Sequence, residues 1–158
     1  MKADMPPKDP AALTTFIETR YHAVHREQLP QLATLALKIE QVHAGAPDVP
    51  QGLGALLQHM IGELEVHMKK EELILFPAIR RGGMPGLENP IAVMRADHDD
   101  HQAEVAQIRA LTNDLTLPAG ACRTWTALYE GLAVFLDDLD AHIRLENEVL
   151  FPQFEPAA

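Results

Sequence analysis

The sequence predicts an all-α protein, an antiparallel up-down-up-down four-helix bundle with an internal pseudo-twofold repeat. Apolar residues recur at helical spacing in four long segments, and no alternating pattern typical of a strand is found. The connections between these segments are short, which favours antiparallel neighbours. A histidine that precedes a glutamate by four positions also occurs twice, in matching contexts.

The first helical segment is expected over residues 11–44. Its apolar positions are Leu13, Phe16, Ile17, Tyr21, Val24, Leu32, Leu35, Ala36 and Ile39. Pro30 lies inside it, so a kink or a short break is expected there. The polar, proline-rich residues 1–10 are expected to form a flexible N-terminus, and residues 11–156 to form one domain. Gly45 to Pro50 have the composition of a turn.

The second helix is expected over residues 51–81, with Leu53, Leu56, Leu57, Met60, Leu64 and Met68 on its apolar side. Glycines and prolines at residues 82–86 predict its end. A third helix is expected over residues 89–111, with Pro90 in the tolerated first turn. After a connection at residues 112–117, the fourth helix is expected from Pro118 to Phe154.

Residues 67–77 and 142–152 share one pattern, in which an apolar run ending in Leu-Phe-Pro follows the histidine and the glutamate. The pairs are His67 with Glu71 and His142 with Glu146. On an α-helix this spacing puts imidazole and carboxylate on one face, one turn apart. Surface salt bridges are the simpler explanation, and we expect them of Glu72 and Glu148. Neighbouring leucines bury the face of Glu71 and Glu146, however, and a buried carboxylate without a cation is costly.

A second match supports a duplicated helical hairpin, because a shift of 76 residues lays His22 and His25 onto His98 and His101. Two facing His–Glu pairs would form the cage of a di-metal site inside the bundle. Residues three apart are helix neighbours, so spacing does not choose between the two histidines of each pair. The rise of 1.5 Å per residue puts three helices' candidates at one level. His142 lies about two turns deeper, an offset that an extended connection would absorb.

The remaining histidines are expected outside the site. His43 lies about 31 Å from His22 on a continuous helix, and it has no counterpart in the second half. His59 is also unmatched, and we expect both at the surface or at a helix end. The single cysteine, Cys122, excludes an internal disulfide framework and is expected to be a small buried side chain near a helix start.

Composition excludes several classes of partner. The net charge of −10 argues against nucleic acid, since phosphate binding requires a basic surface. No apolar run has the length of a membrane span, and no basic amphipathic stretch suggests a membrane surface. The beginning of the chain lacks the apolar core of a signal peptide, so a cytoplasmic protein is expected.

Mixed imidazole and carboxylate ligands suit iron, manganese or zinc better than calcium or magnesium. The absence of clustered thiolates argues against an iron–sulfur cluster held by this chain. Few histidines per metal leave open positions, which small ligands such as oxygen, nitric oxide or peroxide can occupy.

From Tyr21 to Pro152 the sequence resembles the hemerythrin-like (HHE) domains, and within them the RIC (repair of iron centres) di-iron proteins. The stretches that carry the resemblance are residues 21–30, 42–44, 67–72, 75–77, 90–94, 97–99, 121–125, 142, 145–147 and 151–152.

The resemblance implies a bundle that holds two iron ions joined by an oxo or hydroxo bridge. Carried over onto this sequence, the ligands are His22, His67, His98 and His142, with Glu71 and Glu146 as bridges. Family accounts also implicate the position of His43. Glu63 and Asp97 match acidic residues beside the site, and His101 would add a ligand or an outer hydrogen bond.

The function implied is the repair of iron–sulfur clusters damaged by nitric oxide or oxidative stress, by iron donation or by handling nitric oxide, with damaged iron–sulfur proteins as partners. The alternatives are a reversible oxygen or nitric oxide carrier or sensor, an oxidoreductase that reduces nitric oxide or peroxide, and a metal-free bundle used for association. Five imidazoles would favour the carrier, and acidic residues leading to solvent would favour iron delivery. Longer RIC proteins carry a small cysteine-containing domain ahead of the bundle, so we expect a short or truncated form.

Overall fold

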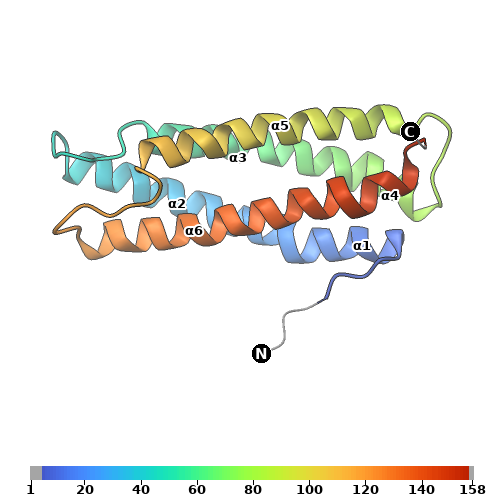
Figure 1. The fold of residues 1–158 in the computed structure, drawn as a ribbon, viewed down its shortest axis with the longest axis horizontal. Coiled ribbons are helices and arrows are strands. Elements are labelled where there is room, and N and C mark those ends of the chain that lie inside the picture. Colours follow the sequence, from blue (N-terminus) through green and yellow to red (C-terminus); the bar gives the residue numbers. More distant parts are fainter. Residues whose placement is uncertain (1–4, 157–158) are drawn as a thin grey trace.

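In the computed structural model, which describes residues 5–156, four long helical rods run antiparallel to one another (Figure 1). The first two rods comprise α1 (Pro10–Ile17), η1 (Glu18–His22) and α2 (Ala23–Val42), then α3 (Leu53–Lys70), η2 (Glu71–Leu75) and α4 (Phe76–Arg80). The last two comprise α5 (Glu88–Leu111), then α6 (Arg123–Arg144), η3 (Leu145–Leu150) and η4 (Phe151–Phe154). No strand occurs within residues 5–156. The predicted all-helical bundle is confirmed.

The first rod begins at Pro10, where the side chain of Asp9 accepts a hydrogen bond from the backbone N–H of Ala12 at 2.9 Å. Proline at the first helical position has no N–H to leave unpaired, so the two residues together start the helix. The flexible segment predicted over residues 1–10 includes residues 1–4, which lie outside the described residues.

The irregular turns of the rods lie elsewhere than predicted. Pro30 is inside α2, which continues through it, so the expected break is absent. Three π-helical segments occur instead, and the backbone N–H of Ala23 bonds the carbonyl of Glu18 five residues before it. Phe76 bonds Glu71 and Phe151 bonds Glu146 in the same way. Such π turns are rare and occur frequently at functional sites.

The rods are joined at residues 43–52, 81–87 and 112–122, and the first and third connections lie at the same end of the bundle (Figure 1). The predicted start of the last helix near Pro118 is wrong, because α6 begins at Arg123. Asn113, Asp114 and Leu115 have φ of 50°, 54° and 59°, and Gly120 has φ of 78°. Left-handed residues cannot continue a helix, so the connection is longer than expected.

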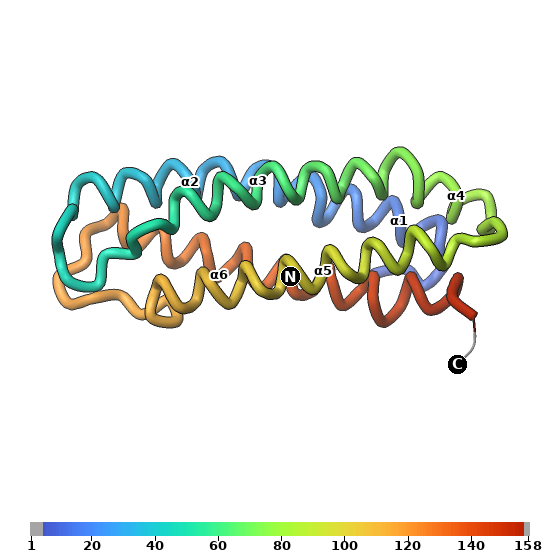
Figure 2. Tube along the Cα trace, turned by 90° about the horizontal axis from the view of Figure 1, so that it is seen from above, coloured from blue at the N-terminus to red at the C-terminus, as the bar shows by residue number. Residues whose placement is uncertain are grey.

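The helices bury two separate apolar clusters, since α2 packs against α3 and α6, and α3 packs against α5 (Figure 2). One cluster comprises Leu29, Leu32, Ala33, Ala36, Ile39, Leu53, Leu57, Met60, Leu64, Met68, Ile108, Trp125, Leu128, Tyr129, Leu132, Phe135, Leu136, Leu139 and Ile143. The other comprises Leu13, Ile17, Leu75, Phe76, Ala78, Ile79, Leu87, Ile91, Met94, Leu150 and Phe151. Among residues 5–156, no helix has the length and apolar character that a membrane crossing requires.

Buried polar side chains lie between the two clusters along the rods. They are His22, His25, His67, Glu71, His98, His101, His142 and Glu146. Burying polar groups without partners costs free energy, so a polar layer inside a bundle marks the part of the molecule that carries function.

Candidate metal centre

The four rods bring six buried side chains together as two groups that share their carboxylates. The first group is His22, Glu71, His142 and Glu146, and the second group is His67, Glu71, His98 and Glu146. Within each group the candidate ligand atoms all lie within 4.8 Å of one another. The π turns supply part of this arrangement, because His22 ends η1, Glu71 begins η2 and Glu146 lies in η3.

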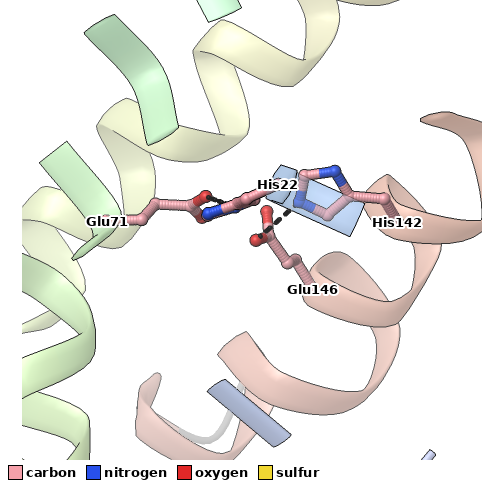
Figure 3. Close-up of side chains that lie close together, drawn as sticks. All are labelled: His22, Glu71, His142 and Glu146. Carbon is pink, nitrogen blue, oxygen red and sulfur yellow. Dashed lines mark hydrogen bonds and ion pairs between the residues drawn. The ribbon is translucent and has the colours of Figure 1, made fainter. Parts of the chain in front are cut away.

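In the first group, each histidine faces one glutamate. His22 Nε2 lies 3.1 Å from Glu71 Oε1, and His142 Nε2 lies 3.0 Å from Glu146 Oε2 (Figure 3). These side chains come from three of the rods and point toward one another in Figure 3.

The second group uses the same two carboxylates from the other side. His67 Nε2 lies 3.5 Å from Glu71 Oε1, and His98 Nε2 lies 2.8 Å from Glu146 Oε1. Glu146 thus presents one oxygen to each group. Two groups with shared carboxylates are the arrangement that bridging ligands of a two-cation centre require.

Unpaired polar atoms test whether cations fit here. Within the described residues, six buried side-chain atoms have no hydrogen-bond partner: His67 Nε2, Glu71 Oε2, His98 Nε2, His101 Nε2, Trp125 Nε1 and Glu146 Oε1. All but the tryptophan atom lie in the polar layer. Each such atom costs about 1–3 kcal/mol, so this layer alone would offset most of the net stability of a typical domain. Cations held by both groups would remove that cost, so the residues present fit a pair of metal ions.

The protonation states also suit metal binding. Burial lowers the pKa of His22 to about 4, and burial lowers the pKa of His67 as well. Burial likewise opposes the charge on His98, but its hydrogen bond to Glu146 outweighs burial and raises the pKa of His98. Burial, followed by the charge of Glu146, raises the pKa of Glu71. A cation would hold Glu71 in its ionised form, and neutral imidazoles keep the lone pair that a metal needs.

Each imidazole of the two groups is held from behind through its Nδ1 atom. The partners are Glu72 Oε2 for His22 at 2.7 Å, Asp97 Oδ2 for His67 at 3.0 Å, Asn147 Oδ1 for His98 at 2.7 Å and His25 Nε2 for His142 at 3.1 Å. Contacts of this kind fix the ring orientation and leave Nε2 for a metal.

Two of these partners were not expected from the sequence. Glu72 was expected only in a surface salt bridge. It does pair with Arg26, at 2.8 Å, but its other contact is with buried His22. Asn147 had no predicted role. A signal was present in both cases, because each follows a glutamate of the two groups directly in the chain. Glu148 lies near Arg144 at 3.9 Å on the exposed surface, as expected.

His25 and His101, which the sequence left open, lie in the polar layer but outside both groups. Besides its contact with His142, His25 places Nδ1 3.3 Å from Gln28 Oε1. His101 places Nδ1 3.4 Å from Glu104 Oε1, and its ring centre lies 5.1 Å from that of His67. Both histidines therefore support the groups from outside.

His43 and His59 also lie outside the two groups. His43 stands at the end of α2, with Nε2 3.4 Å from Cys122 Sγ. Cys122 caps the start of α6, as its position predicted, but it is half-buried, so the expected full burial is wrong. The side chain of His59 is 61% exposed, which confirms its expected surface position.

A cavity of about 520 Å³ reaches the second group from the surface. Its lining residues include His67 and His101 at its inner side and the acidic residues Glu63, Asp97 and Asp100. The arrangement gives cations and small molecules a route to His67 that passes carboxylates.

Comparison with known proteins agrees with this geometry. Residues 15–154 match the hemerythrin HHE cation binding domain family. The chain is 49% identical over 141 residues to the iron-sulfur cluster repair protein YtfE of Yersinia pseudotuberculosis, and equally to that of Yersinia pestis. These alignments cover 89% of this chain and 64% of each relative, so the chain spans somewhat less than two thirds of their length. The buried His–Glu groups and the match over nearly the whole bundle together show that the chain belongs to the hemerythrin HHE cation-binding domain family.

Proposed function

We propose that the two groups hold two iron ions joined by an oxo or hydroxo bridge. His22 and His142 would bind one ion and His67 and His98 the other, with Glu71 and Glu146 bridging. The observation that carries this proposal is that both groups contain the same two buried glutamates. The cation-binding family and the unpaired Nε2 and carboxylate oxygens support it.

We further propose that the chain acts in the repair of iron–sulfur clusters damaged by nitric oxide or oxidative stress, in the cytoplasm and with damaged iron–sulfur proteins as partners. The relatives in Yersinia are named as iron-sulfur cluster repair proteins, which supports this role. Residues 11–156 would form the di-iron domain, preceded by the short segment 1–10.

The number of imidazoles supports open positions on the ions. Each group contains two histidines, and His25 and His101 belong to neither. When bound, iron in such a site supplies coordination positions for nitric oxide, oxygen or peroxide. The protein orients the four imidazoles and buries them, while Glu63, Asp97 and Asp100 attract cations along the cavity. Acidic residues on this route favour iron donation over a closed oxygen carrier.

The test mixes the iron-loaded protein with an iron–sulfur enzyme whose cluster nitric oxide has damaged, and follows the activity that returns. We expect recovery with the wild-type protein and little with Glu146→Gln, because the variant lacks one bridging carboxylate. Glu148→Gln is the matched control, since this exposed residue lies two positions further along the chain and should leave recovery unchanged. Equal recovery with Glu146→Gln and with wild type would refute the role of the buried centre.

If the iron-loaded protein restores no activity but binds nitric oxide or oxygen reversibly, the carrier or sensor alternative holds instead. Consumption of nitric oxide or peroxide with turnover would identify an oxidoreductase. Finding one zinc ion or no metal after aerobic purification would contradict the di-iron centre itself.

A further inference from the structure

A third histidine–glutamate pair with the same four-residue spacing lies on α3, formed by His59 and Glu63. It precedes His67 and Glu71 by eight residues, about 12 Å along the helix. The shift that relates the two halves places Phe135 opposite His59, so this pair is not part of the duplication.

The pair is completed by a carboxylate from the neighbouring helix α5. His59 Nε2 lies 3.0 Å from Glu63 Oε1 and 3.7 Å from Glu104 Oε2, and the three candidate ligand atoms lie within 4.8 Å of one another. Within residues 5–156, neither Glu63 nor Glu104 forms an ion pair with a lysine or arginine. Two carboxylates thus face one imidazole without a neutralising charge.

Glu104 is the buried member of this cluster, since its side chain is only 9% exposed. Burial raises its pKa, and the nearby charge of Glu63 raises it further. Asp100 adds to the same effect, whereas His59 opposes it. A buried carboxylate beside a second carboxylate is destabilising unless a cation or a proton compensates it.

A second observation that points to a ligand comes from His101. Its side chain is 3% exposed, its Nδ1 atom contacts Glu104, and its Nε2 atom has no hydrogen-bond partner. His101 lines the same cavity as His59 and Glu63. The cluster therefore contains an unpaired buried nitrogen as well as three converging ligand atoms.

We propose that His59, Glu63 and Glu104 bind a third divalent cation at the outer part of the cavity. Imidazole and carboxylate ligands select a transition metal such as Zn²⁺ or Fe²⁺ over Ca²⁺ or Mg²⁺. Three protein ligands leave a position for water. Because the side chains of His59 and Glu63 are 61% and 42% exposed, this ion exchanges with solvent faster than ions at the buried centre. His101 acts as a positioning residue that holds Glu104.

The experiment measures zinc bound by iron-loaded protein in equilibrium dialysis, together with the iron content of the same samples. Wild type should bind one more Zn²⁺ per chain than His59→Ala, with equal iron in both. Glu104→Gln should lose the same ion. Glu88→Gln, at an exposed position of the same helix α5, is the matched control and should bind zinc like wild type.

Diffraction at the zinc absorption edge locates the extra ion. An anomalous peak between His59, Glu63 and Glu104 is expected, and its absence from His59→Ala crystals would complete the assignment. Equal zinc content in wild type and His59→Ala would overturn the proposal, and His59→Ala changes an exposed side chain that folding does not require. Failure of the di-iron proposal would appear separately, as missing iron in wild type, because the difference in zinc between the two proteins does not depend on what fills the buried centre.

Discussion

The two metal groups are built from the same residue types but differ in what surrounds them. In the first group, His22 and His142 are enclosed by Glu72, which binds Arg26, and by His25. In the second group, His67 lines a cavity of about 520 Å³ with acidic walls. One ion would be enclosed by protein, and the other would be accessible.

The duplication explains how this difference arose within matching halves. His25 and His101 are counterparts, and each places Nδ1 near a side chain three residues further on, Gln28 or Glu104. His25 then places Nε2 against His142, whereas His101 Nε2 has no hydrogen-bond partner.

The divergence is concentrated at one matched pair of positions. Under the shift of 76 residues, Tyr21 corresponds to Asp97. Tyr21 stacks on His142 with ring centres 5.4 Å apart, while Asp97 contacts His67 Nδ1 at 3.0 Å. An aromatic ring covers one histidine, and a carboxylate that also lines the cavity holds the other. A duplicated scaffold can therefore make two ions chemically unequal by changing residues outside the ligand set.

The largest effect is expected where the two groups join. Glu71→Gln or Glu146→Gln should lose one or both iron ions, because each removes a charged bridging oxygen from both groups at once. Iron and protein determination on purified variants measures this. Iron that stays at two per chain would remove that residue from the centre.

The enclosed side should show a pH effect through His25. Burial, followed by the proximity of His142, lowers the pKa of His25 from 6.5 to about 3, so below 6.5 only the unfolded chain takes up this proton. Between about pH 7.5 and pH 5, wild-type metal-free protein should lose about 2 kcal/mol of stability through this residue. His25→Gln lacks that loss, so its destabilisation should be about 2 kcal/mol smaller at the lower pH. Urea unfolding at both values measures it, and an unchanged difference would show that His25 is charged in the folded protein.

The accessible side can be closed at Gly62, which lines the cavity and where an added Cβ would meet no atom within 4 Å. Gly62→Leu should slow the removal of iron by a chelator several-fold while leaving the iron content at two. Gly62→Ala is the control, because it makes a similar gain in helix propensity without filling the cavity. Equal rates for the two variants would mean that iron leaves by another path.

The smallest effect is expected at the outer edge of the enclosed side. Arg26 pairs with Glu65 at 2.9 Å and with Glu72 at 2.8 Å, but its side chain is 34% exposed. Such a partly exposed pair contributes about 0.5 kcal/mol, so Arg26→Gln should lower the free energy of unfolding by that amount and retain both irons. Arg144→Gln, at a more exposed ion pair, should change stability even less. Loss of iron from Arg26→Gln would show that Glu72 needs this partner to hold His22.

The sequence predicted the helical rods well because apolar periodicity and turn composition are local signals. It predicted the start of α6 five residues too early, since nothing local revealed the left-handed run at Asn113, Asp114 and Leu115. It also missed the π turns, which break the periodicity of 3.6 residues on which the prediction rested.

What the sequence alone determined is the set of chemical groups: the repeated His–Glu spacing, the matched histidine pairs and a composition that buries them in a helical bundle. What only the tertiary structure decided is how those groups are shared out. The choice of His22 over His25, the role of Glu72 and the cluster of His59 with Glu104 all depend on contacts between helices. Spacing along one helix fixes which side chains share a face, but the rotation and depth of neighbouring helices fix which faces meet.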